Sequence, residues 1–168
     1  MYYIGVDLGG TNIAAGIVNQ DGAIVHKDSV PTGEGGSRAI ADRIGELVKR
    51  LLADKGIKEE ELKAIGIGVP GTANQDSGLV EYANNLGMED EPFLEMLRPY
   101  FKNTRLAFEN DANAAAYAEY RFGTGKGANS MIMVTLGTGI GGGMIFGGEL
   151  FEGINYAAGE FGHFTIKY

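Results

Sequence analysis

The stretch VDLGGT at residues 6–11 joins two hydrophobic segments, and VTLGTG at residues 134–139 does the same later in the chain. Placing one on the other aligns Gly9 with Gly137. Glycine permits a tight turn and leaves backbone N–H groups accessible to an anion. The repeat therefore predicts two hairpins that hold the phosphates of one nucleotide from two sides. We interpret it as a phosphoryl-transfer fold with one hairpin in each lobe.

The composition is that of a globular protein of 168 residues, with 28 glycines and no cysteine. The formal net charge of −8 argues against nucleic acid or an anionic membrane as the main partner. The first residues enter a strand directly, without the basic region and apolar run of a signal peptide, and no apolar stretch is long enough to span a bilayer. We expect a cytoplasmic protein. The absence of cysteine excludes disulfides and any cysteine-based zinc site within these residues.

Strands and helices alternate in an α/β pattern. The expected strands are 2–7, 12–18, 23–27, 64–69 and 105–109, and the expected helices are 37–55, 92–97 and 112–121. Ser37 is the expected N-cap of the long helix and Gly56 its stop, and residues 72–87 are expected to form a loop. Strands at 130–136 and 142–146 open a second sheet. The expected domains are therefore 1–122, a first lobe, and 123–168, the incomplete start of a similar one.

Two stretches imitate a dinucleotide-binding fingerprint, GIGVPG at 66–71 and GTGIGG at 137–142. That fingerprint requires a helix directly after the glycines, so that the pyrophosphate lies at the helix N-terminus. A polar loop is expected after the first stretch and a strand after the second. Neither stretch therefore predicts a dinucleotide site.

Asp7 lies at the end of a buried strand, beside the first glycine turn. A carboxylate there can cap the hairpin, or it can organise Mg²⁺ or its waters while Thr11 and the turn amides approach a phosphate. The second copy of the turn favours the Mg²⁺ role.

Three further polar clusters have both a structural and a functional interpretation. In ENDANA at 109–114, one residue suffices to cap the following helix, and Asp111 can also accept a hydroxyl proton. Glu160 and His163 can pack in a core, bind sugar hydroxyls or, for the histidine, ligate a metal. Asn84 and Asn85 fit a turn or a hydroxyl-rich ligand equally well.

The residues together resemble the ROK family (repressors, open reading frames, kinases) of the actin-like ATPase superfamily, and within it the bacterial glucokinases. The matching stretches run in order over nearly the whole chain: DLGGTN at 7–12, GVPG at 68–71, NNLG at 84–87, ENDANAAA at 109–116, TLGTGIGGG at 135–143 and AGEFGH at 158–163. The resemblance implies an actin-like ATPase (RNase H-like) lobe with a mixed sheet, and the first strands of a second lobe. It also implies an ATP-dependent hexose kinase of carbohydrate metabolism, which phosphorylates the 6-hydroxyl in glycolysis.

The resemblance further implies a role for each matching residue. Asp7, Gly9, Gly10 and Thr11 form the first phosphate loop, with Asp7 on Mg²⁺ through water, and Thr138 and Gly139 form the second. Asp111 is the general base. The implied sugar-binding residues are Gly71, Asn84, Asn85, Asn110, Glu160 and His163, and His163 is also a zinc ligand.

The sequence departs from the family in two respects: members are about twice as long, and their zinc cysteines follow the position of His163. We therefore expect an N-terminal portion that is inactive alone and binds zinc only in a longer chain. ATP and Mg²⁺ are the expected cofactors, glucose the expected hexose, with fructose, allose and N-acetylmannosamine as alternatives, and a homodimer the expected assembly. The alternative function is a non-catalytic sugar-sensing regulator. Such regulators usually carry a helix-turn-helix segment before the first phosphate loop, which here starts at Asp7.

Overall fold

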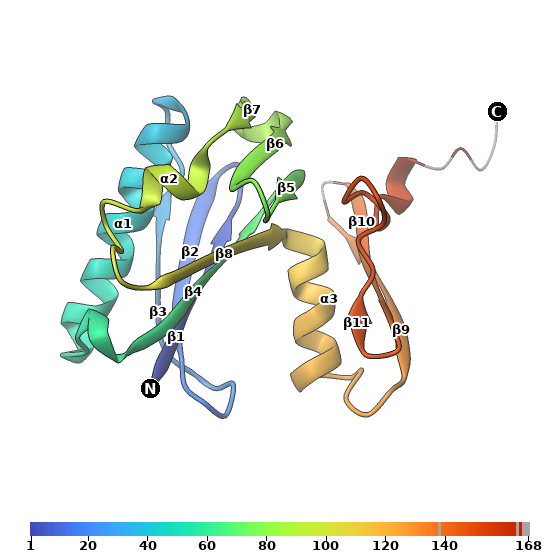
Figure 1. Cartoon of the computed structure of the whole chain (residues 1–168), viewed down its shortest axis with the longest axis horizontal. Coiled ribbons are helices and arrows are strands. Elements are labelled where there is room, and N and C mark those ends of the chain that lie inside the picture. Colours follow the sequence, from blue (N-terminus) through green and yellow to red (C-terminus); the bar gives the residue numbers. More distant parts are fainter. Residues whose placement is uncertain (138, 164, 166–168) are drawn as a thin grey trace. The chain divides into compact units, whose positions relative to one another are not determined.

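The computed structural model describes residues 1–137, 139–163 and 165, and Figure 1 shows its elements. The strands are β1 Tyr2–Leu8, β2 Asn12–Val18, β3 Ile24–Pro31, β4 Leu62–Val69, β5 Thr72–Asn74, β6 Leu79–Ala83, β7 Met88–Glu91, β8 Arg105–Asn110, β9 Ser130–Leu136, β10 Ile140–Phe146 and β11 Glu149–Leu150. The α-helices are α1 Gly36–Lys55, α2 Phe93–Leu97 and α3 Asp111–Phe122, and the 3₁₀ helices are η1 Glu59–Glu61, η2 Asn84–Leu86 and η3 Phe161–His163.

A five-stranded mixed sheet, in the order β3-β2-β1-β4-β8, forms the centre of the first part of the chain. β1 pairs antiparallel with β2 and parallel with β4, as the predicted mixed sheet requires. Side chains alternate between the two faces of a strand, so Ile4, Val6 and Leu8 are buried on one face and Asp7 is exposed on the other. The alternation thus separates the core of the sheet from the face that carries Asp7.

Helix α1 has apolar residues at helical spacing, and these are buried in the same core. It ends, as predicted, at Gly56, which has the left-handed φ of 63° and donates its N–H to carbonyls of the last turn. The predicted N-cap is wrong. The cap residue is Gly35, with φ 112°, and Ser37 is buried inside the first turn. The glycines at 33, 35 and 36 all have positive φ, and this turn carries the chain into the helix earlier than the serine suggested.

Residues 72–91 form a small antiparallel sheet, β5-β6-β7, so the prediction of a loop over 72–87 is wrong. The side chain of Asn74 accepts hydrogen bonds from the N–H groups of Asp76 and Ser77 and so builds the β5–β6 turn. The strands have only three to five residues, too few for an alternating pattern to stand out among polar residues. Val80 and Met88 nevertheless join the main core.

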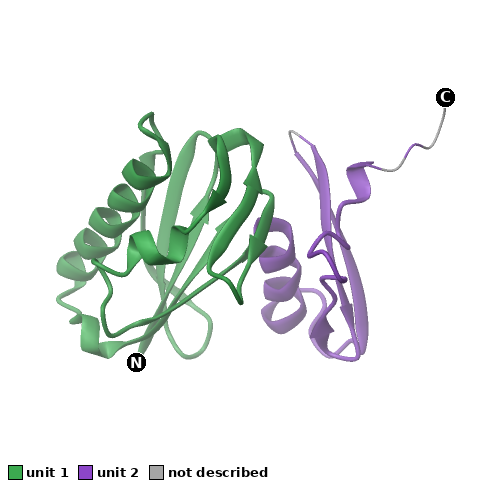
Figure 2. Ribbon diagram, turned by 45° about the horizontal axis from the view of Figure 1, so that its top comes forward, with its two compact units in different colours: residues 1–109 green, residues 110–168 purple. Residues whose placement is uncertain are grey.

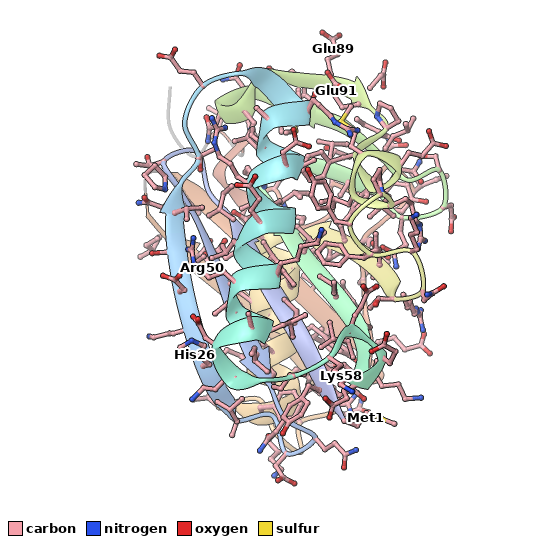
Figure 3. All side chains as sticks on the ribbon, turned by 90° about the vertical axis from the view of Figure 1, so that its left-hand side faces the viewer. Met1, His26, Arg50, Lys58, Glu89 and Glu91 are labelled. Carbon is pink, nitrogen blue, oxygen red and sulfur yellow. The ribbon has the colours of Figure 1, made fainter. Side chains whose placement is uncertain are left out.

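Charged side chains tie the edge strand β3 to α1, and Figure 3 labels His26 and Arg50 on these two elements. The guanidinium of Arg50 donates two hydrogen bonds to Oδ2 of Asp28, at 2.9 and 2.6 Å. His26 Nε2 lies 3.5 Å from Oδ2 of Asp54, a residue of α1.

The chain divides into two compact units, residues 1–109 and 110–168, coloured separately in Figure 2. In the second unit, β9, β10 and β11 form an antiparallel sheet, and α3 packs against β10. The division into compact units does not test the expected lobe boundary after residue 122, which stays a prediction. None of the helices in the described residues is long and apolar enough to cross a membrane.

Candidate functional site

The first glycine turn, Gly9 to Thr11, connects β1 to β2 and is closed by a backbone hydrogen bond. The N–H of Gly9 donates to the carbonyl of Asn12 at 3.0 Å, so this amide is not available to an anion. Among the described residues, the N–H groups of Gly10 and Thr11 have no such acceptor. Neither glycine has a positive φ. A Cβ at position 9 would lie 3.0 Å from the Asn12 carbonyl oxygen, so glycine suits this close approach.

Asp7 stands on the exposed face of β1, beside this turn. Its neighbours across the sheet are Ala14 on β2 and Gly68 on β4, so small groups flank the carboxylate on both sides. A cavity of about 660 Å³ lies over this face and is lined by residues that include Asp7, Ala14 and Ser29. In the described part of the chain, no three His, Cys, Asp or Glu side chains gather where they could hold a metal. An exposed carboxylate fits Mg²⁺ that keeps its waters and binds phosphate oxygens.

The NNLG stretch forms η2 and lies against the glycine turn. A Cβ on Gly10 would be 3.4 Å from the Cβ of Asn85, which places Asn85 directly beside the turn. Asn84 and Asn85 are both exposed. Gly71 has φ 93°, and a Cβ on it would collide with the carbonyl oxygen of Tyr82 on β6. The structure thus brings Gly10 and Asn85 together, and it gives Gly71 a backbone reason to be glycine.

In the second unit, the polar cluster after Glu109 forms the start of α3. Asn110 is the N-cap, and its Oδ1 accepts the N–H of Asn113 at 3.0 Å. Asp111 is the first residue of the helix, is exposed, and accepts the N–H of Ala112 at 2.7 Å. A helix N-terminus favours a negative charge, so this position supports the ionised carboxylate. Asn110 therefore caps the helix, and Asp111 lies at the surface.

The glycine run at 141–143 serves close packing on both sides of β10. A Cβ on Gly141 would lie 3.4 Å from that of Ala112, and one on Gly143 would press on Ala116, so α3 approaches the strand closely. Gly142 faces the other way, against the ring of Phe161. A strand follows Gly139 and the strand β5 follows Gly71, so neither fingerprint-like stretch opens a helix, as predicted.

Glu160 and His163 lie on the segment that ends in η3. Its glycines rest on β10: Gly159 packs against the carbonyl of Gly142, and its Cβ position is 3.4 Å from Oδ1 of Asn113 on α3. This packing carries the Glu160 segment to the N-terminal part of α3. Nε2 of His163 lies 3.6 Å from Oε2 of Glu160, and the histidine side chain is 83% exposed. Interpreting His163 as a packed core histidine is therefore wrong.

Zinc does not fit the residues described here. His163 has one carboxylate near it, whereas a structural zinc site takes four nitrogen or sulfur ligands. No third His, Cys, Asp or Glu in the described ranges joins the pair to complete such a site.

The second glycine turn is described only in part, because Thr138 lies outside the described residues. The N–H of Gly137 donates to the carbonyl of Gly139 at 2.9 Å, which parallels the closing bond made by Gly9. A Cβ on Gly139 would meet no atom of the described residues within 4 Å, so there is open space beside this glycine.

Two residues next to the first turn were missed by the sequence reasoning, Thr32 and Arg43. Thr32 is 2% exposed and bonds to both ends of the turn, and Arg43 bonds to Thr32. A hydroxyl residue directly after a strand, followed by glycines, was the available signal. Its partners lie more than 20 positions earlier and could not be predicted from spacing.

The chain was compared with known protein families, proteins and structures. The model of the ROK family matches residues 3–168. The chain is similar to the glucokinase of Streptomyces coelicolor, at 42% identity over 97% of this chain and 49% of that one. It is also similar to the glucokinase of Halalkalibacterium halodurans, at 37% identity over 98% of this chain and 50% of that one. The chain thus spans about half the length of the curated relatives it matches.

A solved structure shares the fold. The ROK family glucokinase of Streptomyces griseus, in complex with glucose and AMPPNP, superposes with a TM-score of 0.87 at 38% identity. The match covers 99% of this chain and 51% of that one. The agreement of family, relatives and fold confirms the resemblance drawn from the motifs. The chain belongs to the ROK family, and its fold is that of the actin-like ATPases.

Proposed function

We propose that the protein is an ATP-dependent hexose kinase that transfers the γ-phosphoryl group of ATP to the 6-hydroxyl of glucose. The observation that carries the proposal is Asp111, an exposed carboxylate at the N-terminus of α3, in a chain that shares 38% identity with a glucokinase solved with glucose and AMPPNP. Hydroxyl attack on phosphorus needs a base at the acceptor, and a surface carboxylate held by a helix start can supply it.

Asp111 accepts the proton of the attacking hydroxyl in this proposal. Its Oδ1 is oriented by the N–H of Ala112, and Asn110 fixes the helix start through its cap. Because the cap uses the Asn110 side chain, the Asp111 carboxylate is positioned without being buried. Positioning of the reacting groups, together with electrostatic stabilisation, is what a protein contributes to this reaction.

The phosphates are assigned to the two glycine turns. In the first turn, the N–H groups of Gly10 and Thr11 and the Thr11 hydroxyl donate to phosphate oxygens, while Gly9 closes the turn. In the second, Thr138 and Gly139 have the same role. Asp7 contacts Mg²⁺ through water, and the metal, when bound, neutralises charge on the transferred phosphoryl group.

The sugar is assigned to the remaining polar residues of the motifs. The proposed sugar-binding residues are Gly71, Asn84, Asn85, Asn110, Glu160 and His163. Amide groups suit hydroxyls because they both donate and accept hydrogen bonds, and a carboxylate accepts hydrogen bonds from hydroxyls. We also propose that residues 1–122 and 123–168 belong to the two lobes of the kinase, and that the protein is a homodimer.

The test is the Asp111→Asn variant of the full-length protein, assayed by coupled ADP release with glucose and ATP. Removing the base should lower kcat by about 10² to 10⁴-fold and leave the glucose Kd nearly unchanged. Asp21→Asn, which changes an exposed carboxylate in the β2–β3 turn, is the matched control and should keep full activity. Undiminished turnover in Asp111→Asn would overturn the assignment.

Two further measurements separate the alternatives. Assaying the 168-residue chain beside the full-length protein tests whether the chain alone is inactive, and glucose-dependent ADP release from it would reject that expectation. DNA binding by the full-length protein without any ATP turnover would favour the sugar-sensing regulator. A panel of glucose, fructose, allose and N-acetylmannosamine identifies the hexose.

A further inference from the structure

Thr32, the first residue after β3, is bonded to both ends of the first glycine turn. Its hydroxyl donates to the carbonyl oxygen of Gly9 at 2.7 Å, and its N–H donates to the carbonyl oxygen of Thr11 at 2.8 Å. The side chain is 2% exposed, so water does not compete for the hydroxyl. One buried residue therefore holds the carbonyls of Gly9 and Thr11, the residues on either side of Gly10.

The direction of the Gly9 carbonyl determines the direction of the next N–H. A trans peptide is planar, and its C=O and N–H point in opposite directions. The Gly9 carbonyl points to the Thr32 hydroxyl, so the N–H of Gly10 points away from Thr32 and out of the turn. Glycines on both sides of this peptide make its rotation easy, because no Cβ resists it. The Thr32 hydroxyl opposes that rotation.

Arg43 extends the connection to α1. Its Nη1 donates to the carbonyl of Thr32 at 2.7 Å and its Nη2 to that of Glu34 at 2.7 Å. Gly33 has φ 66°, and a Cβ on it would lie 3.0 Å from the guanidinium carbon, so the chain is pressed closely onto Arg43. Thr32 is thereby held by a residue of the longest helix rather than by a free loop.

We propose that Thr32 is a positioning residue for phosphate binding: its hydroxyl keeps the Gly9–Gly10 peptide oriented with the Gly10 N–H toward the phosphates of ATP. The inference rests on the proposed function, because it assigns this turn to the nucleotide. Without the hydroxyl, the peptide can turn over and present the Gly9 carbonyl oxygen to the phosphates. An oxygen there repels the anion that the amide attracts.

The experiment compares Thr32→Val, which keeps the size and loses the hydroxyl, with Thr32→Ser, which keeps the hydroxyl. Thr104→Val is the matched control. Thr104 is also buried, at 4% exposure; its hydroxyl donates to Glu59, and its carbonyl accepts from Arg98. It lies at the opposite end of the sheet, since Glu59 just precedes β4, whose start pairs with the start of β1.

For each full-length variant, kcat and the KM values for ATP and glucose are measured, with ATP binding by calorimetry and the midpoint of thermal unfolding. We expect Thr32→Val to lower kcat/KM for ATP by about tenfold or more, with the KM for glucose changed less than about twofold. Thr32→Ser should stay within about threefold of the wild type. Thr104→Val should leave both KM values unchanged even where it lowers the unfolding midpoint.

Equal ATP kinetics in Thr32→Val and the wild type would overturn the inference, as would a loss that Thr32→Ser fails to restore. A parallel loss in Thr104→Val would also overturn it, because the effect would then follow stability alone. A wild-type protein that neither binds ATP nor phosphorylates a hexose refutes the proposed function itself, and that result is distinct from all three.

Discussion

Gly71 offers the most direct test of the backbone geometry beside the candidate site. Its φ of 93° is a conformation that residues with a Cβ rarely adopt, and the Cβ of an alanine there would collide with the carbonyl oxygen of Tyr82. The left-handed conformation costs about 1–2 kcal/mol for a residue other than glycine. Overpacking that forces the backbone to move costs about 1–3 kcal/mol more. Gly71→Ala should therefore destabilise the chain by about 2–5 kcal/mol.

Gly87→Ala is the matched control, because it shares one of these costs and lacks the other. Gly87 has φ 62° and ends η2, but a Cβ on it would meet no atom within 4 Å. We expect Gly87→Ala to cost about 1–2 kcal/mol. Both variants lose the same unfolded-state freedom of a glycine, so that contribution cancels when the two are compared.

Urea unfolding of each chain, followed by circular dichroism, measures the two free energies of unfolding. The difference between Gly71→Ala and Gly87→Ala should be about 1–3 kcal/mol, the cost of the collision alone. If Gly71→Ala is no more destabilising than Gly87→Ala, the approach to Tyr82 is not what requires glycine at position 71. The positive φ would then be the structural reason for glycine at this position.

Three further predictions concern packing and charge. Gly45→Ala should destabilise the protein although alanine favours helices, because its Cβ would overlap the ring of Tyr100. In a Tyr100→Ala background the same change should stabilise the protein by about 1 kcal/mol. Urea unfolding of the double-mutant cycle shows whether the sign of the effect reverses. The hydrogen bond from Arg50 lowers the pKa of Asp28 from 3.8. The ionised Asp28 therefore stabilises the fold fully above that value, and this contribution is lost as the pH falls through the lower folded pKa. Asp28→Asn should weaken the fall of the unfolding midpoint in acid, and an unchanged fall would contradict the prediction. The hydrogen bond to Asp42 raises the pKa of Tyr100 above 10.0. The protonated phenol therefore stabilises the fold at neutral pH, and this contribution is lost as the pH rises through the folded pKa. Tyr100→Phe should weaken the fall of the unfolding midpoint in alkali, and spectrophotometric titration of the phenol checks the direction of the pKa shift.

The features that depend on residues close together in the chain were predicted from the sequence. The apolar spacing of α1, its stop at Gly56, the β1–β2 hairpin and the strand at 130–136 all follow from periods of two or 3.6 residues and from turn chemistry. The rejection of both fingerprint-like glycine stretches has the same basis, since a polar loop was expected after the first and a strand after the second, and neither is a helix. Where the strands were too short for a pattern, the prediction of a loop over 72–87 failed.

The interpretation of individual glycines needed the structure. Gly9 and Gly10 were expected to serve a turn that exposes amides, yet the amide of Gly9 is used to close the turn. No sequence pattern explained the glycine run at 141–143, which lets α3 approach β10 on one side and Phe161 pack on the other. Because glycine has no side chain, its sequence position does not tell which neighbour requires the space.

By itself, the sequence of this chain determined the family and the helices and strands with a clear periodicity, and it singled out the candidate site residues, because motifs and periodicity are properties of neighbouring positions. Only the tertiary structure decided that Asn85 lies against Gly10, and that Thr32 and Arg43 hold the turn of Gly9. These contacts join residues 11 to 75 positions apart, and they form when β1, β3, η2 and α1 pack on one core. Hydrogen-bond partners at that separation are chosen by packing, which no local pattern specifies.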